Sequence, residues 1–245
     1  MPAGACALGS DEPPPRIVAK ENTMPTLAIV GAGPGLGAAV ARRFGREGYA
    51  IALISRAQAK LDALAAELQR EGLTARGYAA DVRDGAQLEV ALRSAAADLG
   101  PVTALQYSPL PARAYLHPVL DLEPELALDA LRFSALGLIH AARAVLPAMR
   151  AAGDGSIVLI NGGTSVQARA GFSGTSVAFP AESAYGEMLH EALAPEGVRV
   201  VQLVIPGAIP KLRYTLEEVA DRIWDIQAAP GEFRTMLIPL DEGRE

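Results

Sequence analysis

The sequence contains a single cysteine, Cys6, so it can form neither a disulfide within the chain nor a metal site built from several cysteines. No apolar run approaches the ~18 residues that a membrane-spanning helix requires, so we expect a protein that does not enter a membrane. Aromatic residues are also scarce, at 5% of the chain, although half of all residues are hydrophobic. The apolar content is therefore mostly aliphatic, as expected when helices pack closely on a parallel sheet.

Basic residues are outnumbered by acidic ones, which gives a formal net charge of −6. Nucleic acids and anionic membranes select basic surfaces, so this balance argues against both as partners. The near absence of cysteine is compatible with a reducing compartment. We therefore expect a cytoplasmic protein whose partner is a small-molecule substrate.

The first 24 residues differ in character from the rest of the chain. They include three consecutive prolines at positions 13–15 and show no amphipathic period. They also lack the basic start and apolar stretch of a secretory signal peptide. We expect a disordered tail over residues 1–24 and one domain over residues 25–245.

Short apolar runs alternate with longer helical patterns from residue 25 onward. The predicted strands are Thr26–Val30, Tyr49–Ile54, Ala75–Ala80, Val102–Tyr107, Ser156–Ile160, Val198–Ile205 and Thr235–Leu240. The predicted helices are Gly35–Glu47, Ala57–Glu71, Gly85–Leu99, Leu122–Arg150, Pro180–Ala194 and Thr215–Gln227. This alternation indicates an α/β fold with a doubly wound parallel β-sheet, a Rossmann fold in a single domain.

The long predicted helix at residues 122–150 is apolar around much of its circumference. Leu131, Phe133, Leu136, Leu138 and Ile139 all fall within it. One face of a sheet cannot cover so wide an apolar surface. We therefore expect a homo-oligomer, either a homodimer or a homotetramer, although a fully buried single helix is the alternative.

A glycine-rich loop, GAGPGLG, joins the first predicted strand to the first helix. Its glycines at positions 31, 35 and 37 allow a tight turn and bring backbone N–H groups close to a ligand. The N-terminus of the following helix adds a partial positive charge at the same place. Together these features predict a binding site for the pyrophosphate of a dinucleotide.

The spacing of this loop resembles that of the short-chain dehydrogenase/reductase family, TGxxxGxG, with Val30 in place of the threonine. Asp81-Val82 resembles the family's Asp-Val pair beside the adenine, and Pro206-Gly207 resembles its turn beside the nicotinamide. The resemblance extends from Met24 to about Leu240. It implies a nicotinamide dinucleotide cofactor contacted by these residues: Gly31, Gly33, Gly35, Leu36, Gly37, Asp81, Val82, Pro206, Gly207 and Ile209.

The end of the second predicted strand favours NADP(H) over NAD(H). An acidic residue at this place binds the adenosine ribose hydroxyls in NAD-binding folds. Here the strand ends in Ser55-Arg56. An arginine can hold a 2′-phosphate by two parallel hydrogen bonds, and a serine hydroxyl can add a third. The alternative is that Arg56 is only a solvated residue at the start of a helix.

The catalytic pattern of the family is missing from this sequence. Members carry Asn, Ser, Tyr and Lys, with the Tyr and Lys spaced YxxxK on one helix face. The only lysines are Lys20, Lys60 and Lys211, and none has a tyrosine four residues before it. We therefore expect a catalytic site that does not follow the family pattern.

Counting back from the sixth predicted strand places Thr175 at the Tyr position and Phe179 at the Lys position. The Ser position falls near Gly162 and the Asn position near Ser134. Pro180 disfavours a helix that runs unbroken through residues 176–180, because proline lacks the N–H and clashes one turn back. We expect this wall of the site to be reshaped.

Four residues are candidate replacements for the missing groups: Tyr107, Ser134, Thr164 and Thr175. Tyr107 ends a strand at the edge where α/β sheets bind ligands, but it can equally be a packed tyrosine. His117, in a proline-rich loop, and Lys211, after the Pro-Gly turn, are further polar residues within reach of a substrate or a cofactor phosphate. Solvated side chains are the alternative for both.

The sequence thus favours an NADP(H)-dependent oxidoreductase with a non-standard catalytic site. Its electrophile would need little help from an acid, as an iminium or an activated double bond does. Two alternatives stay open: a redox-neutral enzyme on the same fold (a cyclase, epimerase or lyase) and a non-catalytic NADP(H)-binding protein. The fold alone does not separate them.

Overall fold

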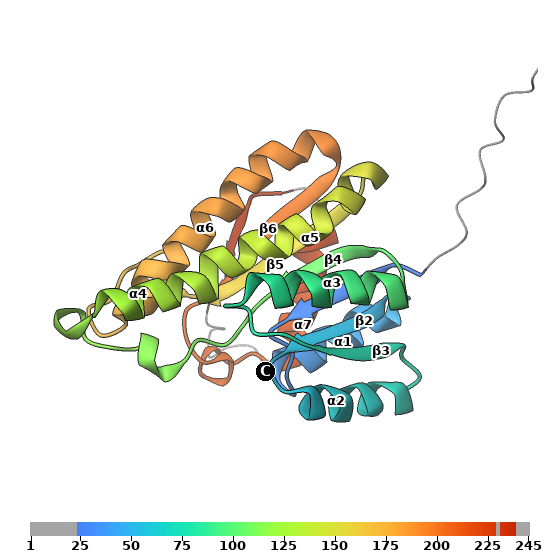
Figure 1. Ribbon diagram of the computed structural model, residues 1–245, viewed down its shortest axis with the longest axis horizontal. Helices are drawn as coiled ribbons and strands as arrows, with labels where there is room; N and C mark the ends of the chain where they lie inside the picture. The colour runs from blue at the N-terminus through green and yellow to red at the C-terminus, as the bar shows by residue number, and fades with distance from the viewer. Residues whose placement is uncertain (1–23, 229–230, 239–245) are drawn as a thin grey trace, which may run out of the picture.

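The computed structural model describes residues 24–228 and 231–238, and in them seven strands form one parallel sheet. The strand order is β3-β2-β1-β4-β5-β6-β7, and every neighbouring pair is parallel (Figure 1). The strands are β1 Thr26–Val30, β2 Ala50–Ser55, β3 Ala75–Ala79, β4 Val102–Tyr107, β5 Gly155–Gly162, β6 Val198–Ile205 and β7 Arg234–Met236. This is the doubly wound Rossmann arrangement that the sequence predicts.

Helices cover both faces of the sheet. They are α1 Leu36–Arg46, α2 Gln58–Arg70, α3 Gly85–Leu99, α4 Pro124–Leu131, α5 Gly137–Ala152, α6 Ser173–Leu193 and α7 Leu216–Ala228. The buried side chains of α1, α2 and α7 belong to one core cluster, and those of α3, α4, α5 and α6 belong to the other. The molecule is therefore a three-layer sandwich with the sheet in the middle (Figure 1).

Strand β1 shows why the strands are apolar along their whole length. Leu27 and Ile29 face the cluster under α1, whereas Ala28 and Val30 face the cluster under α3. Successive side chains of a strand point to opposite faces, so a strand covered on both sides must be apolar at every position. All five residues of β1 are buried.

Helix α6 differs from its prediction, which began the helix at Pro180. The helix begins at Ser173 and continues through Pro180 to Leu193. A proline inside a helix removes one backbone hydrogen bond, but tertiary packing of an apolar face supplies most helical stability. Ala178 and Phe179 are buried in the core immediately before the proline, and this packing maintains the helix.

The long helix predicted over residues 122–150 is made of two α-helices joined by a π-helical turn. This turn, η3, spans Arg132–Leu136 between α4 and α5. A π-turn widens a helix locally and frees a carbonyl from its usual partner, and such turns often lie at functional sites. The turn determines how Tyr107 and Ser134 are placed.

The described part of the chain has neither a helix suited to spanning a membrane nor a cluster of metal-binding side chains. Within residues 24–228 and 231–238, no helix is both long enough and apolar enough to cross a membrane. The same part of the chain contains no cluster of residues able to hold a metal ion. The tail predicted over residues 1–24 lies outside the described residues except for Met24.

Candidate functional site

The carboxyl ends of the strands bring the predicted cofactor residues to one edge of the sheet. The N–H groups of Gly31 and Ala32 donate to the Ile54 carbonyl at 2.9 and 3.0 Å, which ties the glycine loop to the end of β2. The N–H of Ala80 donates to the Ser55 carbonyl at 3.0 Å, which ties the end of β3 to the same place. Ser55, Arg56, Asp81 and Val82 thus follow β2 and β3 at the edge that carries the glycine loop, and their contact with an adenosine stays a prediction.

The three spaced glycines of the loop differ in what an added side chain would meet. Gly31 has a φ of +94°, and a Cβ there would lie 2.6 Å from the backbone of Pro109. A Cβ on Gly37 would lie 3.3 Å from the Cα of Ala32, so this glycine lets α1 approach the loop. A Cβ on Gly35 would meet nothing within 4 Å. Space is therefore open in front of Gly35, where a pyrophosphate would approach the start of α1.

Arg56 is exposed at the end of β2 and makes no hydrogen bond or ion pair with the described part of the chain. Asp81, by contrast, accepts hydrogen bonds from Arg83, at 3.0 Å from its N–H and 2.6 Å from its Nη2. These bonds lower the pKa of Asp81, and the charge of Arg56 adds to the effect. The guanidinium of Arg56 thus remains available for a phosphate.

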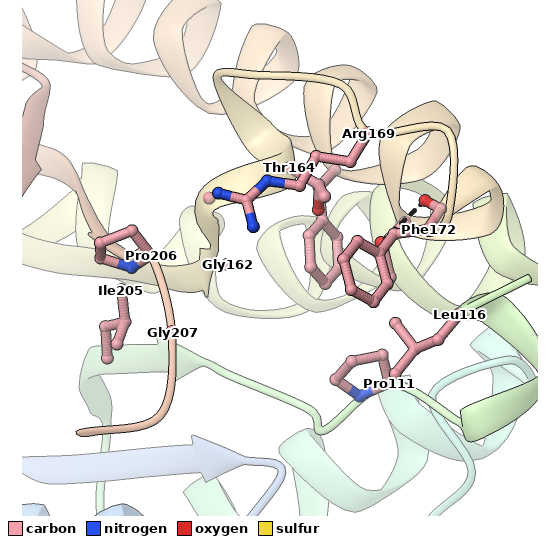
Figure 2. A pocket seen from close by; sticks show the side chains of 12 residues that line it. Pro111, Leu116, Gly162, Thr164, Arg169, Phe172, Ile205, Pro206 and Gly207 are labelled. Carbon is pink, nitrogen blue, oxygen red and sulfur yellow. Dashed lines mark hydrogen bonds between the residues drawn. The ribbon is translucent and has the colours of Figure 1, made fainter. Parts of the chain in front are cut away.

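A pocket of about 360 Å³ lies at the carboxyl ends of β5 and β6. Gly162 and Ile205, which pair across these strands, both line it, as do Pro206 and Gly207 of the predicted nicotinamide turn. The remaining wall comes from the loop after β4 and from the loop and first turns of α6 (Figure 2). The lining is apolar except for the hydroxyls of Thr164 and Thr175 and the guanidinium of Arg169.

Thr175 and Phe179, which the sequence predicts at the family's Tyr and Lys positions, both line this pocket. Both side chains are buried, and the Thr175 hydroxyl donates to the Phe172 carbonyl at 3.2 Å. The residues that line the pocket include no lysine whose ammonium group could make this hydroxyl more acidic. Thr175 is therefore a polar contact and a poor acid, in contrast to a tyrosine beside a lysine.

Tyr107 does not reach the pocket, contrary to the suggestion that it ends at an accessible edge. Its side chain is fully buried, and its hydroxyl donates to the Phe133 carbonyl in the π-turn at 2.6 Å. Burial raises the pKa of Tyr107 well above its usual range. It can therefore neither contact a substrate nor release its proton, and its role is structural.

Ser134 is likewise placed behind the pocket and not in it. It is fully buried, and its hydroxyl donates to the carboxylate of Glu182 and also lies 3.3 Å from the Ala178 carbonyl oxygen. Asn161 donates to the same carboxylate at 3.2 Å, and Gln202 donates to Asn161 at 3.0 Å. Ser134 thus belongs to a buried polar network between the π-turn, α6 and the sheet. Of the four candidate catalytic residues, only Thr164 and Thr175 line the pocket.

The carboxyl group of Glu182 makes this network sensitive to pH. Burial raises the pKa of Glu182 from 4.5 to about 7, against the opposing hydrogen bonds from Ser134 and Asn161. A raised folded-state pKa gives stability that is present below pH 4.5 and is lost as the pH rises through about 7. We expect wild type to lose about 3 kcal/mol of unfolding free energy relative to Glu182→Gln between pH 4.5 and 7.5. Urea denaturation of both proteins at the two pH values tests this, and parallel curves would contradict it.

Sequence reasoning missed Arg169 and Glu182. Arg169 precedes the true start of α6, in a region that was not given a structure because the helix was expected to begin at Pro180. Nothing in the sequence marked Glu182 as a buried residue, because it is one acidic residue within a helical pattern. Gln202 did carry a signal, since it lies in the centre of a strand that is apolar apart from Arg199 near its start, and a buried amide requires polar partners.

Comparison with known proteins agrees with this architecture. The family model for short chain dehydrogenases matches residues 25–213, and the chain belongs to this family. Human dehydrogenase/reductase SDR family member 4 is 28% identical over 175 residues, a match that covers 71% of this chain and 62% of the human protein's length.

Two solved structures illustrate the shared fold. A metagenomic short-chain oxidoreductase in complex with NADP is 22% identical, with a TM-score of 0.77 over 89% of this chain and 99% of that one. An NADPH-bound short-chain oxidoreductase from Pseudomonas aeruginosa PAO1, which contains an atypical catalytic center, is 24% identical. Its TM-score is 0.68 over 74% of this chain and 70% of that one.

Proposed function

We propose that this protein is an NADP(H)-dependent oxidoreductase whose catalytic site lacks the tyrosine–lysine pair. The observation that carries the proposal is the open space at the carboxyl edge of the sheet, where the sequence predicts a dinucleotide. The space in front of Gly35 is open, Arg56 beside it makes no ion pair within residues 24–228 and 231–238, and the pocket begins at the Pro206-Gly207 turn of the same sheet edge. In α/β sheets, ligands bind outside the carboxyl ends of the strands.

The residues present fit NADP(H) along most of its length. The glycine loop and the start of α1 would hold the pyrophosphate, Ser55 and Arg56 the 2′-phosphate, and Pro206-Gly207 the nicotinamide side. When bound, the cofactor supplies hydride chemistry. Phe179 replaces the lysine that would hold the nicotinamide ribose, so we expect this half of the cofactor to be fixed mainly by apolar contacts.

The pocket residues can orient a substrate but offer no group that titrates near neutral pH. Thr164 and Thr175 supply hydroxyls, and Arg169 supplies a guanidinium. General acid catalysis typically contributes about 10²–10⁴-fold in rate, and we propose that this site works without it. The chemistry that suits such a site is hydride transfer to an already electrophilic acceptor, such as an iminium or an activated double bond.

Arg56 should decide the preference for NADP(H). We expect Arg56→Ala to weaken NADPH binding by about 10- to 100-fold and to leave NADH binding unchanged, because only NADPH carries the 2′-phosphate. Calorimetric titration of both proteins with both dinucleotides measures the effect. Arg70→Ala, which removes an exposed arginine from the far end of α2, is the matched control and should change neither affinity. Equal losses for NADPH and NADH would contradict the assignment of Arg56.

The absorbance of NADPH tests the activity itself and separates the alternatives. The proposal expects NADPH to be consumed with at least one member of a panel of aldehydes, ketones, imines and enones. Binding of NADPH without consumption across the panel would favour a redox-neutral enzyme or a non-catalytic binding protein. Conversion of a compound without net change in NADPH would then distinguish the redox-neutral enzyme from the binding protein.

The homodimer or homotetramer stays a prediction. Exposed apolar side chains on η3 and α6 support it, namely Leu136, Val177 and Met188. Side chains of this kind on neighbouring helices are suited to pairing with a second copy of the chain.

A further inference from the structure

We propose that the pocket takes a substrate with an apolar body and an anionic group, and that Arg169 binds the anion. The inference rests on the proposed function only in that it concerns the same pocket. It does not depend on hydride transfer, and it is tested by binding alone.

The chemistry of the lining selects an apolar molecule with one negative group. The walls are formed largely by proline, leucine, isoleucine and phenylalanine side chains, including Leu116, Phe172 and Phe179. Arg169 is the single charged residue among the lining residues, and no acidic residue lines the pocket with it. A mostly apolar pocket with a few placed polar groups is the usual form of a small-molecule site, and the polar groups set its specificity.

The guanidinium of Arg169 is directed along the pocket and has no partner among the described residues. Figure 2 shows its side chain extending from the loop past Thr164 toward the side of Pro206. It makes no hydrogen bond or ion pair with any residue in the described ranges, whereas other arginines, such as Arg42 and Arg150, hold carboxylates by paired bonds. Arg169 thus has its bidentate donor set free for a carboxylate or a similar anion.

The backbone that carries Arg169 is held in place. Its N–H donates to the Ser176 hydroxyl at 3.0 Å, and its carbonyl accepts from the Phe172 N–H at 2.9 Å. The adjacent Ala170 carbonyl accepts from Val119 at 2.7 Å, which joins this loop to the loop after β4. Because the backbone of Arg169 is already held in place, less conformational entropy is lost when its side chain binds an anion, and the affinity is reduced less.

The other polar residues considered from the sequence do not compete for this role. Lys211 is exposed in the turn η6, Ile209–Leu212, and is not among the residues that line the pocket. His117 contributes its carbonyl to the start of α6, where it accepts from the N–H and hydroxyl of Ser173 at 3.0 and 2.8 Å. Its ring does not line the pocket either. Arg169 is therefore the cation that a bound anion would meet.

The test compares 3-phenylpropionate with its neutral isostere, 3-phenylpropanamide. Binding of each is measured by calorimetry to the whole protein, with and without saturating NADP⁺. We expect the carboxylate to bind at least about tenfold more tightly than the amide, the effect of one charge-assisted bidentate contact near solvent. Arg169→Gln should abolish that difference, Arg169→Lys should keep part of it, and Arg70→Gln should keep all of it.

Two results would overturn the proposal: equal affinities of wild type for the acid and the amide, or an undiminished preference in Arg169→Gln. Failure of the proposed function would look different. In that case NADP⁺ would not bind, but the carboxylate preference would still be present in the titration without NADP⁺ and would still depend on Arg169. Thermal unfolding of each variant verifies that it is folded, and the exposed position of Arg169 makes a folding defect unexpected.

Discussion

Gly35→Asp should reduce NADPH binding by more than about 100-fold while leaving the fold intact. The space in front of Gly35 is open, so the added side chain meets no protein atom within 4 Å of its Cβ. In the proposed binding mode, the pyrophosphate would approach the start of α1 through this same space. A carboxylate there adds both bulk and negative charge against two phosphates, and it competes for the N–H groups of the helix start. Calorimetry with NADPH measures the loss.

Gly231→Asp is the matched control for this prediction. Its Cβ would also meet nothing within 4 Å, and it precedes β7 at the opposite, amino edge of the sheet. Both variants should unfold at nearly the wild-type temperature, and only Gly35→Asp should lose NADPH. Retained NADPH binding in Gly35→Asp would show that the dinucleotide, if bound at all, does not lie on this loop.

Gly137→Ala should destabilise the fold by about 3 kcal/mol, although alanine is the better helix former. In an unconstrained helix this change gains up to about 1 kcal/mol. Here the new Cβ would overlap the Tyr107 hydroxyl and lie 2.9 Å from the Val82 carbonyl oxygen. The hydroxyl cannot withdraw without losing its bond to the Phe133 carbonyl, and overpacking of a tight core typically costs about 1–3 kcal/mol. Urea denaturation gives the free energy of unfolding.

Tyr107→Phe tests the physical reason for that loss. Alone it should cost about 1 kcal/mol, because it removes one buried hydrogen bond. Combined with Gly137→Ala it should recover part of the stability, since the oxygen that clashes is gone while the Val82 carbonyl remains. The two changes should thus be strongly non-additive, as expected for groups in contact. Additive losses would show that the Tyr107 hydroxyl is not the obstacle.

Local pattern predicted most of the fold correctly. Strands β4 and β6 and helix α3 begin and end at the residues that the sequence indicates, because their apolar spacing and flanking turn residues agree. Helix α3 also carries its own start signal, since the Asp84 side chain accepts from the Gln87 N–H. The glycine loop was also predictable from local sequence, because glycines at fixed spacing between a strand and a helix indicate a tight turn.

The catalytic side was less predictable because it depends on contacts between distant segments. Tyr107 and Ser134 face inward because the π-turn carries a carbonyl over the first and Glu182 lies beside the second. Neither the π-turn nor the passage of α6 through Pro180 has a local sequence signal. Arg169 could not be predicted as a site residue, because its neighbours in the sequence give no indication of a site. It lines the pocket because two loops that are distant in the sequence lie together in the fold.

Calorimetric titration of the purified protein with NADPH, and separately with NADH, tests whether the chain binds a dinucleotide and which one it prefers. We predict tight binding of NADPH and markedly weaker binding of NADH, because the open glycine loop would accept both dinucleotides whereas Arg56 would hold a 2′-phosphate that only NADPH carries. Failure to bind either dinucleotide would contradict the account, and it would leave a short-chain dehydrogenase fold whose activity does not involve the cofactor.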